Sequence, residues 1–588
     1  MKRLRELAVA HAPMLAAAAV LTLLIQAPLY LFPVLEGSAY QGINIQQYGS
    51  DEHYYLLRAA SIARGGSPSD PVLREGKDAG DHTFSYAEKL LIKPAAWLGL
   101  FDTVSIVTFV NSVNAVGVFV LILLIYAFAF QLGRDKRLAL ATAVFVIGGY
   151  SIVYNKSFFY SDFNVYGRMM FPLMSSLFFF GYLYFLTLSL RTGKRLHIAS
   201  AGALFGALFY LYYFAWSFSL AATGLLAVWF LLKKEWGQAR HVLIVLGMGI
   251  ALGAYNVVRL FSYFGSPEGE QSSYFAWSLH THQPVFSLIS VVTLVVLVYF
   301  SFKTKWSDTV FIPLAFSLVG AGIAALNEQV ITGVLVQYGH YYWYFIVPLS
   351  IIIAAYCLWS LLERQSYKTI FVFMLVGAAF INTAVGQYRS YAAVLEAKRY
   401  EQHFAPALEI LASDERPGVV LAADDRDASL VPIYASRYLF WYTQAMEGGA
   451  PVARLKEALF TYTYLSKGGT GDIKAFLTAE LGKRERSMYA DLFRTLEGLG
   501  SGLDYLVYVD KLAAHDPMLL ARRVQVLDAL AVEYESFSKT PHGVEQVLRD
   551  QGVGYILWDR NRYPDWDFSF LSAELLQEEG GIALYRVL

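Results

Sequence analysis

Long apolar segments fill the first two thirds of the chain, and they constrain its fold more than any other feature. A helix needs about 20 mostly apolar residues to cross the roughly 30 Å hydrocarbon core of a bilayer. A composition of 56% hydrophobic and only 16% charged residues excludes a soluble globular enzyme and a disordered chain. We predict eleven transmembrane helices, over residues 12–33, 104–131, 138–155, 169–190, 198–213, 215–232, 241–263, 285–302, 309–326, 343–362 and 369–386.

The segments between these spans alternate between two compositions, one basic and the other rich in carboxylates, histidines and aromatic residues. Short cytoplasmic loops are enriched in Lys and Arg, which fixes the orientation of a membrane protein. The basic set comprises Lys2, Arg3 and Arg5; Arg134, Lys136 and Arg137; Arg191, Lys194 and Arg195; Lys233, Lys234 and Arg240; Lys303 and Lys305; and Arg364 and Lys368. The opposite set holds carboxylates, histidines and aromatics and comprises 34–103, 155–168, 264–284, 327–342 and the tail after 388. We therefore predict a protein of the cell (inner) membrane with a cytoplasmic N-terminus.

The tail has the composition of a soluble domain, with amphipathic charged stretches between short β-rich runs. The predicted strands are 418–424, 503–510, 553–559 and 582–588, and the predicted helices include 516–533 and 543–551. The fold class is thus a polytopic α-helical membrane protein with a C-terminal α/β domain in the periplasm or outside the cell. The predicted domains are 1–389, with a long first outside loop at 34–103, and 390–588.

Charge and cysteine content exclude several functions. Forty-seven basic and forty-seven acidic residues cancel, so the electrostatic footprint of a nucleic-acid binder is missing and no nucleic-acid partner is expected. The lone cysteine, Cys357, can form no internal disulfide and supplies no thiolate cluster for a metal.

The first outside loop contains the most specific pattern, within GSDEHYYLLRAASIARGG at 49–66. Asp51, Glu52, Tyr54, Tyr55 and Arg58 fall within about two turns of a predicted helix just above the membrane. A carboxylate there can act as a general base or a metal ligand, and an arginine can hold a phosphate. The alternative is that the two acids only cap the helix and interact with its dipole.

The Asp51-x-x-Tyr54-Tyr55-x-x-Arg58 pattern, in a multi-span half followed by an outside domain, resembles GT-C glycosyltransferases, especially the catalytic subunits of bacterial and archaeal oligosaccharyltransferases. The resemblance implies that a sugar moves from a polyprenyl-phosphate carrier to an acceptor outside the cytoplasm. It also implies that Asp51, with Glu52 as its rival, serves as the catalytic base or as a metal ligand.

The second outside loop supplies the remaining metal candidates. Such enzymes often carry a DxD motif there, and the nearest match in this chain is Asp162-x-Asn164, in which the second carboxylate is missing. With Asp51 these residues would offer oxygen ligands to a divalent cation, Mg²⁺ or Mn²⁺. For the donor phosphate we predict Arg58, together with Arg168 and the intramembrane Arg259. The alternatives are interfacial anchors for Arg168 and a salt bridge within the bundle for Arg259.

The polar segment at 326–345 supplies candidates for the pocket. The resemblance implies an active-site glutamate in a late outside loop, where Glu328 stands. Amide and imidazole groups suit sugar hydroxyls. The predicted sugar or acceptor pocket comprises Tyr54, Tyr55, Glu328, Gln329, Gln337 and His340. The family's WWD-type acceptor motif has its closest counterpart in FWYTQ at 440–444, which lacks the carboxylate and leaves the acceptor open.

Together these features predict a GT-C-type glycosyltransferase that acts with inversion at the anomeric carbon. Its partners would be a polyprenyl-phosphate-linked sugar donor, a glycan, lipid or protein acceptor, and the lipid bilayer. One alternative is a noncatalytic glycan assembly or polymerisation factor on the same scaffold, which the incomplete DxN motif favours. The other is a secondary transporter, which would place carboxylates near the midplane of the bilayer.

Overall fold

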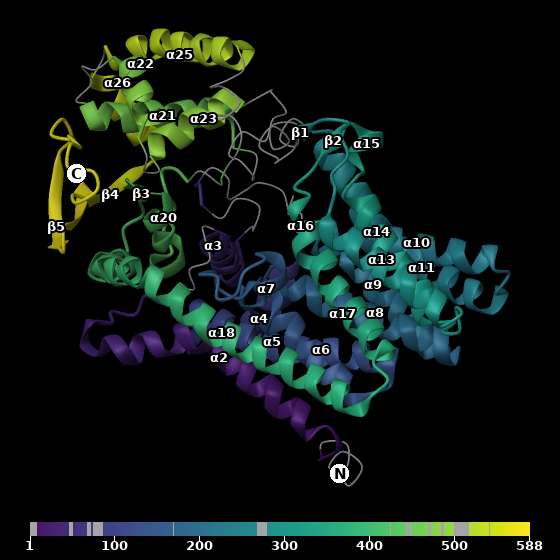
Figure 1. The fold of residues 1–588 in the computed structure, drawn as a ribbon. Helices are drawn as coiled ribbons and strands as arrows, with labels where there is room; N and C mark the ends of the chain where they lie inside the picture. Colours follow the sequence, from purple (N-terminus) through teal and green to yellow (C-terminus); the bar gives the residue numbers. More distant parts are fainter. Residues whose placement is uncertain are drawn as a thin grey trace.

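The structure is a computed structural model, and it describes residues 9–45, 51–66, 72–74, 86–168, 170–266, 279–423, 425–442, 445, 450–467, 472–483, 487–498, 517–539 and 541–588. A bundle of helices occupies most of the molecule, and a C-terminal part lies beside one end of it (Figure 1). The N-terminus lies at the end of the bundle far from this C-terminal part (Figure 1).

Helices fill the predicted spans because their apolar runs are long enough to satisfy every backbone group internally. They are α2 (Ala12–Glu36), α5 (Ile106–Gly133), α6 (Lys136–Gly148), α8 (Leu173–Thr192), α9 (Arg195–Leu211), α10 (Tyr213–Leu232), α11 (Trp236–Phe264), α13 (Leu288–Lys303), α14 (Phe311–Ala325), α17 (Val347–Leu361) and α18 (Gln365–Glu401). Eleven spans were predicted, whereas within the described residues eight helices are long and apolar enough to cross a membrane. Of the others, α9 and α13 are shorter apolar helices, and α6 has 13 residues.

The span predicted at 138–155 differs most from the structure, because α6 ends at Gly148 and the short α7 (Tyr150–Tyr154) follows it. Gly148 lies against α18, where an added Cβ would stand 2.8 Å from the carbonyl oxygen of Ala379. In addition, the carbonyl oxygen of Gly148 itself accepts a hydrogen bond of 2.9 Å from Asn382 Nδ2 on α18. Close packing on α18 therefore ends α6 and directs the chain into the loop at 155–168.

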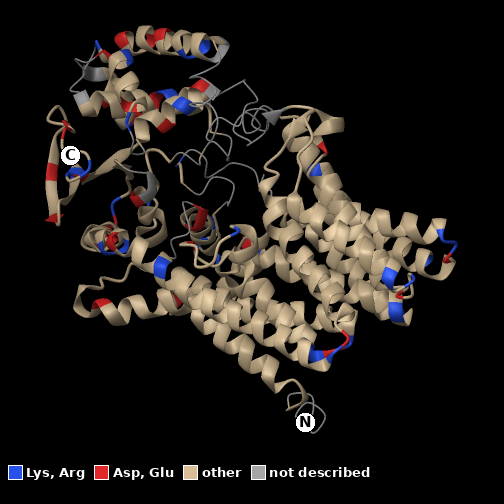
Figure 2. Cartoon of the chain, viewed as in Figure 1, with Lys and Arg blue, Asp and Glu red and all other residues tan. Residues whose placement is uncertain are grey.

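The basic loops meet at one end of the bundle. Arg191 donates to the carbonyl of Leu132, and Lys136 donates to the carbonyl of Ala10 near the N-terminus. Figure 2 shows few charged residues along the bundle, with Lys and Arg gathered at this end. The outside-loop candidates lie at the other end, toward the C-terminal part. This separation agrees with the predicted alternation of loops, while the side of the membrane remains a prediction.

The C-terminal part contains a four-stranded mixed sheet in the order β3-β4-β6-β5. Strand β3 (Val419–Ala422) runs parallel to β4 (Val553–Asp559), and β6 (Ile582–Val587) is antiparallel to β4 and to β5 (Ala573–Glu579). The helices of this part are α19 (Ala405–Ser413), α20 (Asp425–Ala428), α21 (Val452–Lys467), α22 (Ile473–Leu481), α23 (Met488–Gly498), α25 (Pro517–Ser538) and α26 (Pro541–Asp550).

Three predicted strands are confirmed, and the run at 503–510 lies outside the described residues. Sequence analysis missed β5, whose sequence AELLQEE is polar. This strand is at the edge of the sheet and is mostly open to solvent, so it lacks the apolar signal of a core strand.

The helix of the first outside loop, α3 (Asp51–Ala63), packs into the core of the C-terminal part. Leu56 and Leu57 are fully buried in one cluster with Val420 and Leu421 of β3. On the same helix, His53 Nδ1 lies 2.6 Å from the Ser429 hydroxyl. The C-terminal part thus holds the helix that carries the acid pair.

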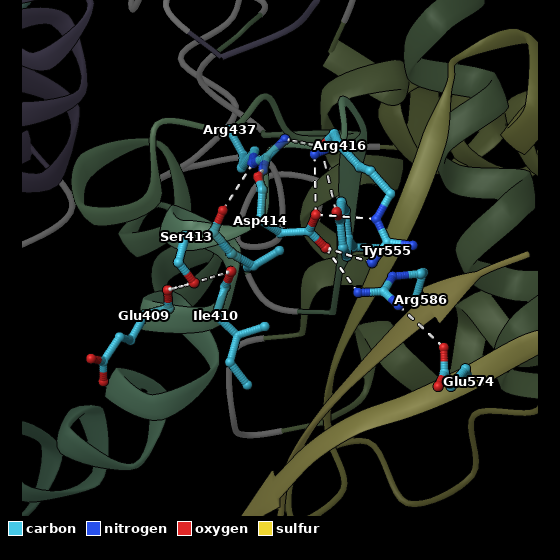
Figure 3. A network of polar contacts seen from close by, with 10 residues as sticks. Glu409, Ile410, Ser413, Asp414, Arg416, Arg437, Tyr555, Glu574 and Arg586 are labelled. Carbon is cyan, nitrogen blue, oxygen red and sulfur yellow. Dashed lines mark hydrogen bonds and ion pairs between the residues drawn. The ribbon is translucent and has the colours of Figure 1, made fainter.

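A charged network around Asp414 joins the end of α19 to the sheet (Figure 3). Asp414 accepts hydrogen bonds from Arg416 Nε at 3.1 Å and from Arg586 Nη2 at 2.9 Å, and Arg586 also contacts Glu574. Arg437 donates to the carbonyls of Leu411, Asp414 and Arg416. These bonds satisfy carbonyls that the end of α19 leaves open.

We expect Asp414→Asn to lower the thermal stability of the protein at neutral pH. The hydrogen bonds from Arg416 hold the pKa of the Asp414 carboxyl well below its ordinary value of 3.8. A depressed folded-state pKa stabilises the protein above the ordinary value and loses that contribution as the pH falls below it. Thermal unfolding should therefore separate wild type from Asp414→Asn at pH 7, and the difference should shrink below about pH 4. Asp528→Asn, in an exposed pair with Lys474, is the control and should change little.

Candidate functional site

An arginine joins the acid pair at the start of α3. Arg168, which follows the 3-10 helix η4 (Val165–Gly167), donates from Nη2 to Asp51 Oδ2 at 2.6 Å and from Nε to Glu52 Oε1 at 2.8 Å. Its Nη1 lies 3.5 Å from the hydroxyl of Tyr344. One guanidinium therefore contacts both predicted catalytic carboxylates. We call Asp51, Glu52 and Arg168 the ion triad. It joins the two acids predicted to act in catalysis to an arginine predicted to bind the donor phosphate.

The two carboxylates of this triad differ in exposure. Glu52 is completely buried, whereas the side chain of Asp51 is 49% exposed. Burial raises the pKa of Glu52, although the charge of Arg168 opposes the shift. The carboxylates in turn raise the pKa of Arg168, so its guanidinium stays charged. Asp51 is consequently the member of the pair that an incoming molecule can reach.

A second charged cluster surrounds the other end of α3. Arg58 Nε forms a buried ion pair of 2.8 Å with Glu88 Oε1 on α4 (Ala87–Trp97). Lys89 Nζ and the guanidinium carbon of Arg259 lie 4.9 Å and 4.7 Å from the ring centre of Tyr86. Arg259 also donates to Asn256 Oδ1 at 2.9 Å. Two of the three predicted phosphate ligands, Arg58 and Arg259, are thus close together.

Sequence analysis missed Lys89, which the structure adds to this cluster. Burial lowers the pKa of Lys89 to about 8, with further contributions from the charges of Lys93, Arg259 and Arg58. Arg58, Lys89 and Arg259 thus place three cationic groups near one another, and Glu88 pairs with Arg58. The available signal was the pair of lysines four residues apart in AEKLLIKPAAW, which share one helix face.

Aromatic rings lie beside both clusters. Tyr55 contacts the ring of Phe171 at 5.5 Å, and Phe171 stacks on Tyr212 at 4.8 Å. His340 Nδ1 lies 2.7 Å from the Tyr212 hydroxyl. Tyr54 is buried against Arg58, whose guanidinium carbon is 5.5 Å from its ring centre. Of the predicted pocket residues, Tyr55 and His340 belong to one aromatic wall beside the ion triad.

The other predicted pocket residues lie further from the triad's contacts. Glu328 is half-buried, and its Oε2 is 3.5 Å from the Tyr341 hydroxyl. Gln329 is fully buried and donates to the carbonyl of Gln283. The backbone carbonyl of Gln337 accepts a hydrogen bond from the amide of His340. Glu328 thus contacts Tyr341, which follows His340 of the aromatic wall. Gln329 holds the segment between α11 and α13 through its bond to Gln283.

A cavity of about 210 Å³ opens beside Arg168, between the loop at 155–168, α7 and α18. Its polar lining includes Asp162, Asn164 and Arg168, with Trp343 and Tyr344 as aromatic walls. Drug-sized ligands occupy pockets of roughly 300–1,000 Å³, so this volume suits a single small ring. Asp162 and Asn164 therefore line a cavity together with Arg168, whose guanidinium also contacts the acid pair.

The predicted metal ligands do not form an oxygen cage. Both carboxylates of the acid pair contact Arg168. The Asn164 side chain accepts from the amide of Tyr166 at 3.0 Å and donates to the carbonyl of Ile147 at 2.7 Å, so it caps η4. Within the described residues, no group of three or more His, Cys, Asp or Glu side chains could hold a metal ion. In the structure, Asp51, Glu52 and Asn164 therefore all contact protein groups.

The fold and these clusters define a multi-span helical membrane protein with a charged site at one end. No protein-family model matches the chain, and no curated protein matches it. It is structurally similar to the Archaeoglobus fulgidus oligosaccharyltransferase in its apo form, with 11% identity, a TM-score of 0.44, and coverage of 93% of this chain and 69% of that one. The same enzyme tethered to an acceptor peptide with the NVT sequon gives 12% identity, a TM-score of 0.46 and the same coverage.

Proposed function

We propose that this protein is a membrane glycosyltransferase that moves a sugar from a polyprenyl-phosphate-linked donor to an acceptor outside the cytoplasm. The observation that carries the proposal is the placement of a carboxylate at the start of α3 and of a group of cations on and beside the same helix. A half-exposed carboxylate, Asp51, begins the helix, and the cation cluster of Arg58, Lys89 and Arg259 lies about two turns along it. Such a pair suits a base that acts near a departing phosphate.

The surroundings of the cation cluster favour a phosphate attached to a lipid. Leu90, Trp97 and Leu98 are exposed apolar residues on and just after α4. On α11, Val258 and Phe261 flank Arg259 and are also exposed. A helix with exposed apolar and basic residues at the end of a membrane bundle is typical of an interfacial helix. The carrier chain would lie in the bilayer along α4 and α11, with its phosphate at Lys89 and Arg259.

The reaction then follows from these positions. Asp51 accepts the proton of an acceptor hydroxyl or amide, and the freed lone pair forms a bond to the anomeric carbon from the face opposite the carrier. The bond between the anomeric carbon and the phosphate oxygen breaks, and the electron pair leaves with the polyprenyl phosphate. Lys89 and Arg259 stabilise the departing charge in a site that the aromatic wall shields from water. The cavity beside Arg168 offers room for one sugar ring.

The proposal is tested with full-length protein in lipid nanodiscs and a panel of polyprenyl-phosphate sugars. We expect release of free polyprenyl phosphate to depend on the protein and on one donor of the panel. Release at the background rate for every donor, combined with an unaltered cell-envelope glycan in cells that carry Asp51→Asn, would contradict the proposal and favour a noncatalytic assembly factor.

Donor binding should weaken as the pH rises through about 8. Burial, with smaller contributions from Lys93, Arg259 and Arg58, lowers the pKa of Lys89 to about 8, so its ammonium is charged below that pH and neutral above it. A bound phosphate stabilises the charged form, so affinity is highest below the pKa. We expect the affinity for polyprenyl phosphate, measured in nanodiscs at pH 7 and pH 9.5, to fall at the higher pH. Lys89→Met should bind weakly at both values, and the exposed Lys194→Met at the basic end should behave like wild type.

A further inference from the structure

We propose that Arg168 is a tethered cation that takes the place of a divalent metal ion between Asp51 and Glu52. The role of the acid pair in this inference rests on the proposed function. The claim about metal binding rests on geometry alone. It makes Arg168 a positioning residue of the site instead of a ligand of the donor phosphate.

The contacts of the guanidinium match those expected of a permanent counter-ion. Nε and Nη2 each donate to a different carboxylate, at 2.8 Å to Glu52 and 2.6 Å to Asp51. These lengths are typical of charge-assisted hydrogen bonds, and the planar fork fixes both acids in one arrangement. A divalent cation bound to the same pair would stand next to this guanidinium and be repelled by it. Metal binding and the observed arrangement therefore exclude each other.

The residues just before Arg168 are also fixed by hydrogen bonds to α5 and α18. The carbonyl of the preceding residue, Gly167, accepts a hydrogen bond of 2.5 Å from Asn114 Nδ2 of α5. The amide of Asn164 donates to Gln387 Oε1 of α18 at 2.8 Å, and Tyr166 between them is fully buried. The side chain of Arg168 itself is only 16% exposed. The bundle thus presents the guanidinium to the acid pair as a preorganised group.

The loop lacks the groups that would complete a metal site. Asn164 stands where a second carboxylate would serve a cation; its Oδ1 caps η4 by accepting from Tyr166 N, and its Nδ2 donates to the carbonyl of Ile147 on α6. Asp162 is one carboxylate in the same loop, and in the described part of the chain no third acid or histidine joins the pair. The positive charge next to the acids is therefore covalently part of the chain, and the substitution of arginine for metal explains why an incomplete DxN motif suffices.

Direct metal binding tests the inference without any assay of activity. Binding of Mn²⁺ to the full-length protein in nanodiscs is measured by electron paramagnetic resonance and calorimetry. We expect wild type to show only weak, nonspecific binding. Arg168→Gln frees both carboxylates and should bind Mn²⁺ at least tenfold more tightly, and adding Asp51→Asn to that variant should remove the gain. Wild-type binding at one tight site that Asp51→Asn abolishes would overturn the inference.

Two further variants keep the test decisive. Arg168→Lys retains the charge and should show no gain in Mn²⁺ binding, and Arg389→Gln, which removes another arginine that contacts the same loop, should behave like wild type. If Arg168→Gln is unstable, Mn²⁺ should raise its melting temperature and leave that of wild type unchanged; equal shifts in both would count against the inference.

Measuring sugar transfer with and without a chelator of divalent cations distinguishes failure of this inference from failure of the proposed function. Where sugar transfer is detected, we expect a strong chelator of divalent cations to leave its rate within twofold of the untreated protein. Loss of transfer with the chelator and recovery with Mn²⁺ would overturn the inference while supporting the function. Absence of transfer with every donor counts against the function, and the binding measurements still decide the role of Arg168.

Discussion

Asp51→Asn is expected to slow sugar transfer by about 10²–10⁴-fold, the usual contribution of a positioned general base. The exchange removes the basic oxygen but keeps the size of the side chain and its ability to accept a hydrogen bond from Arg168. The carrier phosphate is expected at Lys89 and Arg259, so its affinity should stay within about twofold of the wild-type value. Single-turnover release of polyprenyl phosphate and equilibrium binding of the carrier measure the two effects separately.

The matched control is Asp135→Asn at the opposite end of the bundle. Asp135 also begins a helix, where its side chain accepts hydrogen bonds from the amides of Arg137 and Leu138. Asparagine caps a helix about as well as aspartate, so Asp135→Asn should leave the transfer rate close to wild type and controls for the loss of a charge at a helix start. Glu52→Gln should slow transfer less than Asp51→Asn, because Glu52 is fully buried. Equal rates for Asp51→Asn and Asp135→Asn would reduce Asp51 to a helix cap and contradict its role as the base.

Replacement of Glu88 by leucine is expected to lower the free energy of unfolding by about 3–5 kcal/mol, because it leaves a buried charge without its partner. Glu88 is 1% exposed and Arg58 is 9% exposed, and the pair links α4 to α3. The uncompensated guanidinium would be only 9% exposed at its present position. Denaturant unfolding of the protein in detergent, followed by tryptophan fluorescence, measures the change.

Two comparisons show that the effect arises from the buried pair. The double variant Arg58→Met with Glu88→Leu removes both charges and should recover most of the lost stability, because apolar residues replace a buried ion pair at little cost. Glu545→Leu breaks an exposed i,i+4 pair with Arg549 on α26 and should cost no more than about 0.5 kcal/mol. An equally small effect of Glu88→Leu would show that Arg58 finds water or another partner.

The sequence predicted the helices of the bundle well because crossing a bilayer depends on local composition. A run such as 104–131 is apolar enough to form a helix whatever surrounds it, and α5 (Ile106–Gly133) occupies that range. The span at 138–155 was predicted less well, since its break at Gly148 depends on contact with Ala379 of α18, more than 200 residues away. The polar edge strand β5 was missed because its partner β6, not its own composition, makes it a strand.

The candidate site shows the same division. The acids Asp51 and Glu52 and the cations Arg58, Arg168 and Arg259 stand out in the sequence because charges are rare in such a chain. Their grouping was not predictable. Arg168 pairs with Asp51 across 117 positions. Lys89 and Glu88 come near Arg58 and Arg259 because α3 packs on α4 and Arg259 of α11 lies over Tyr86 at the start of α4. Pair distances depend on packing between distant segments, which a single sequence does not specify.

By itself, then, the sequence determined that this chain spans a membrane with helices, that basic loops alternate with loops rich in acids and aromatics, and that a domain with strands follows. These properties depend on the hydrophobicity and charge of consecutive residues. Only the tertiary structure decided that α3 packs into the core of the C-terminal part and that Arg168 contacts both Asp51 and Glu52. The physical reason is that a buried charge is stable only beside its partner, and the fold determines which partner it meets.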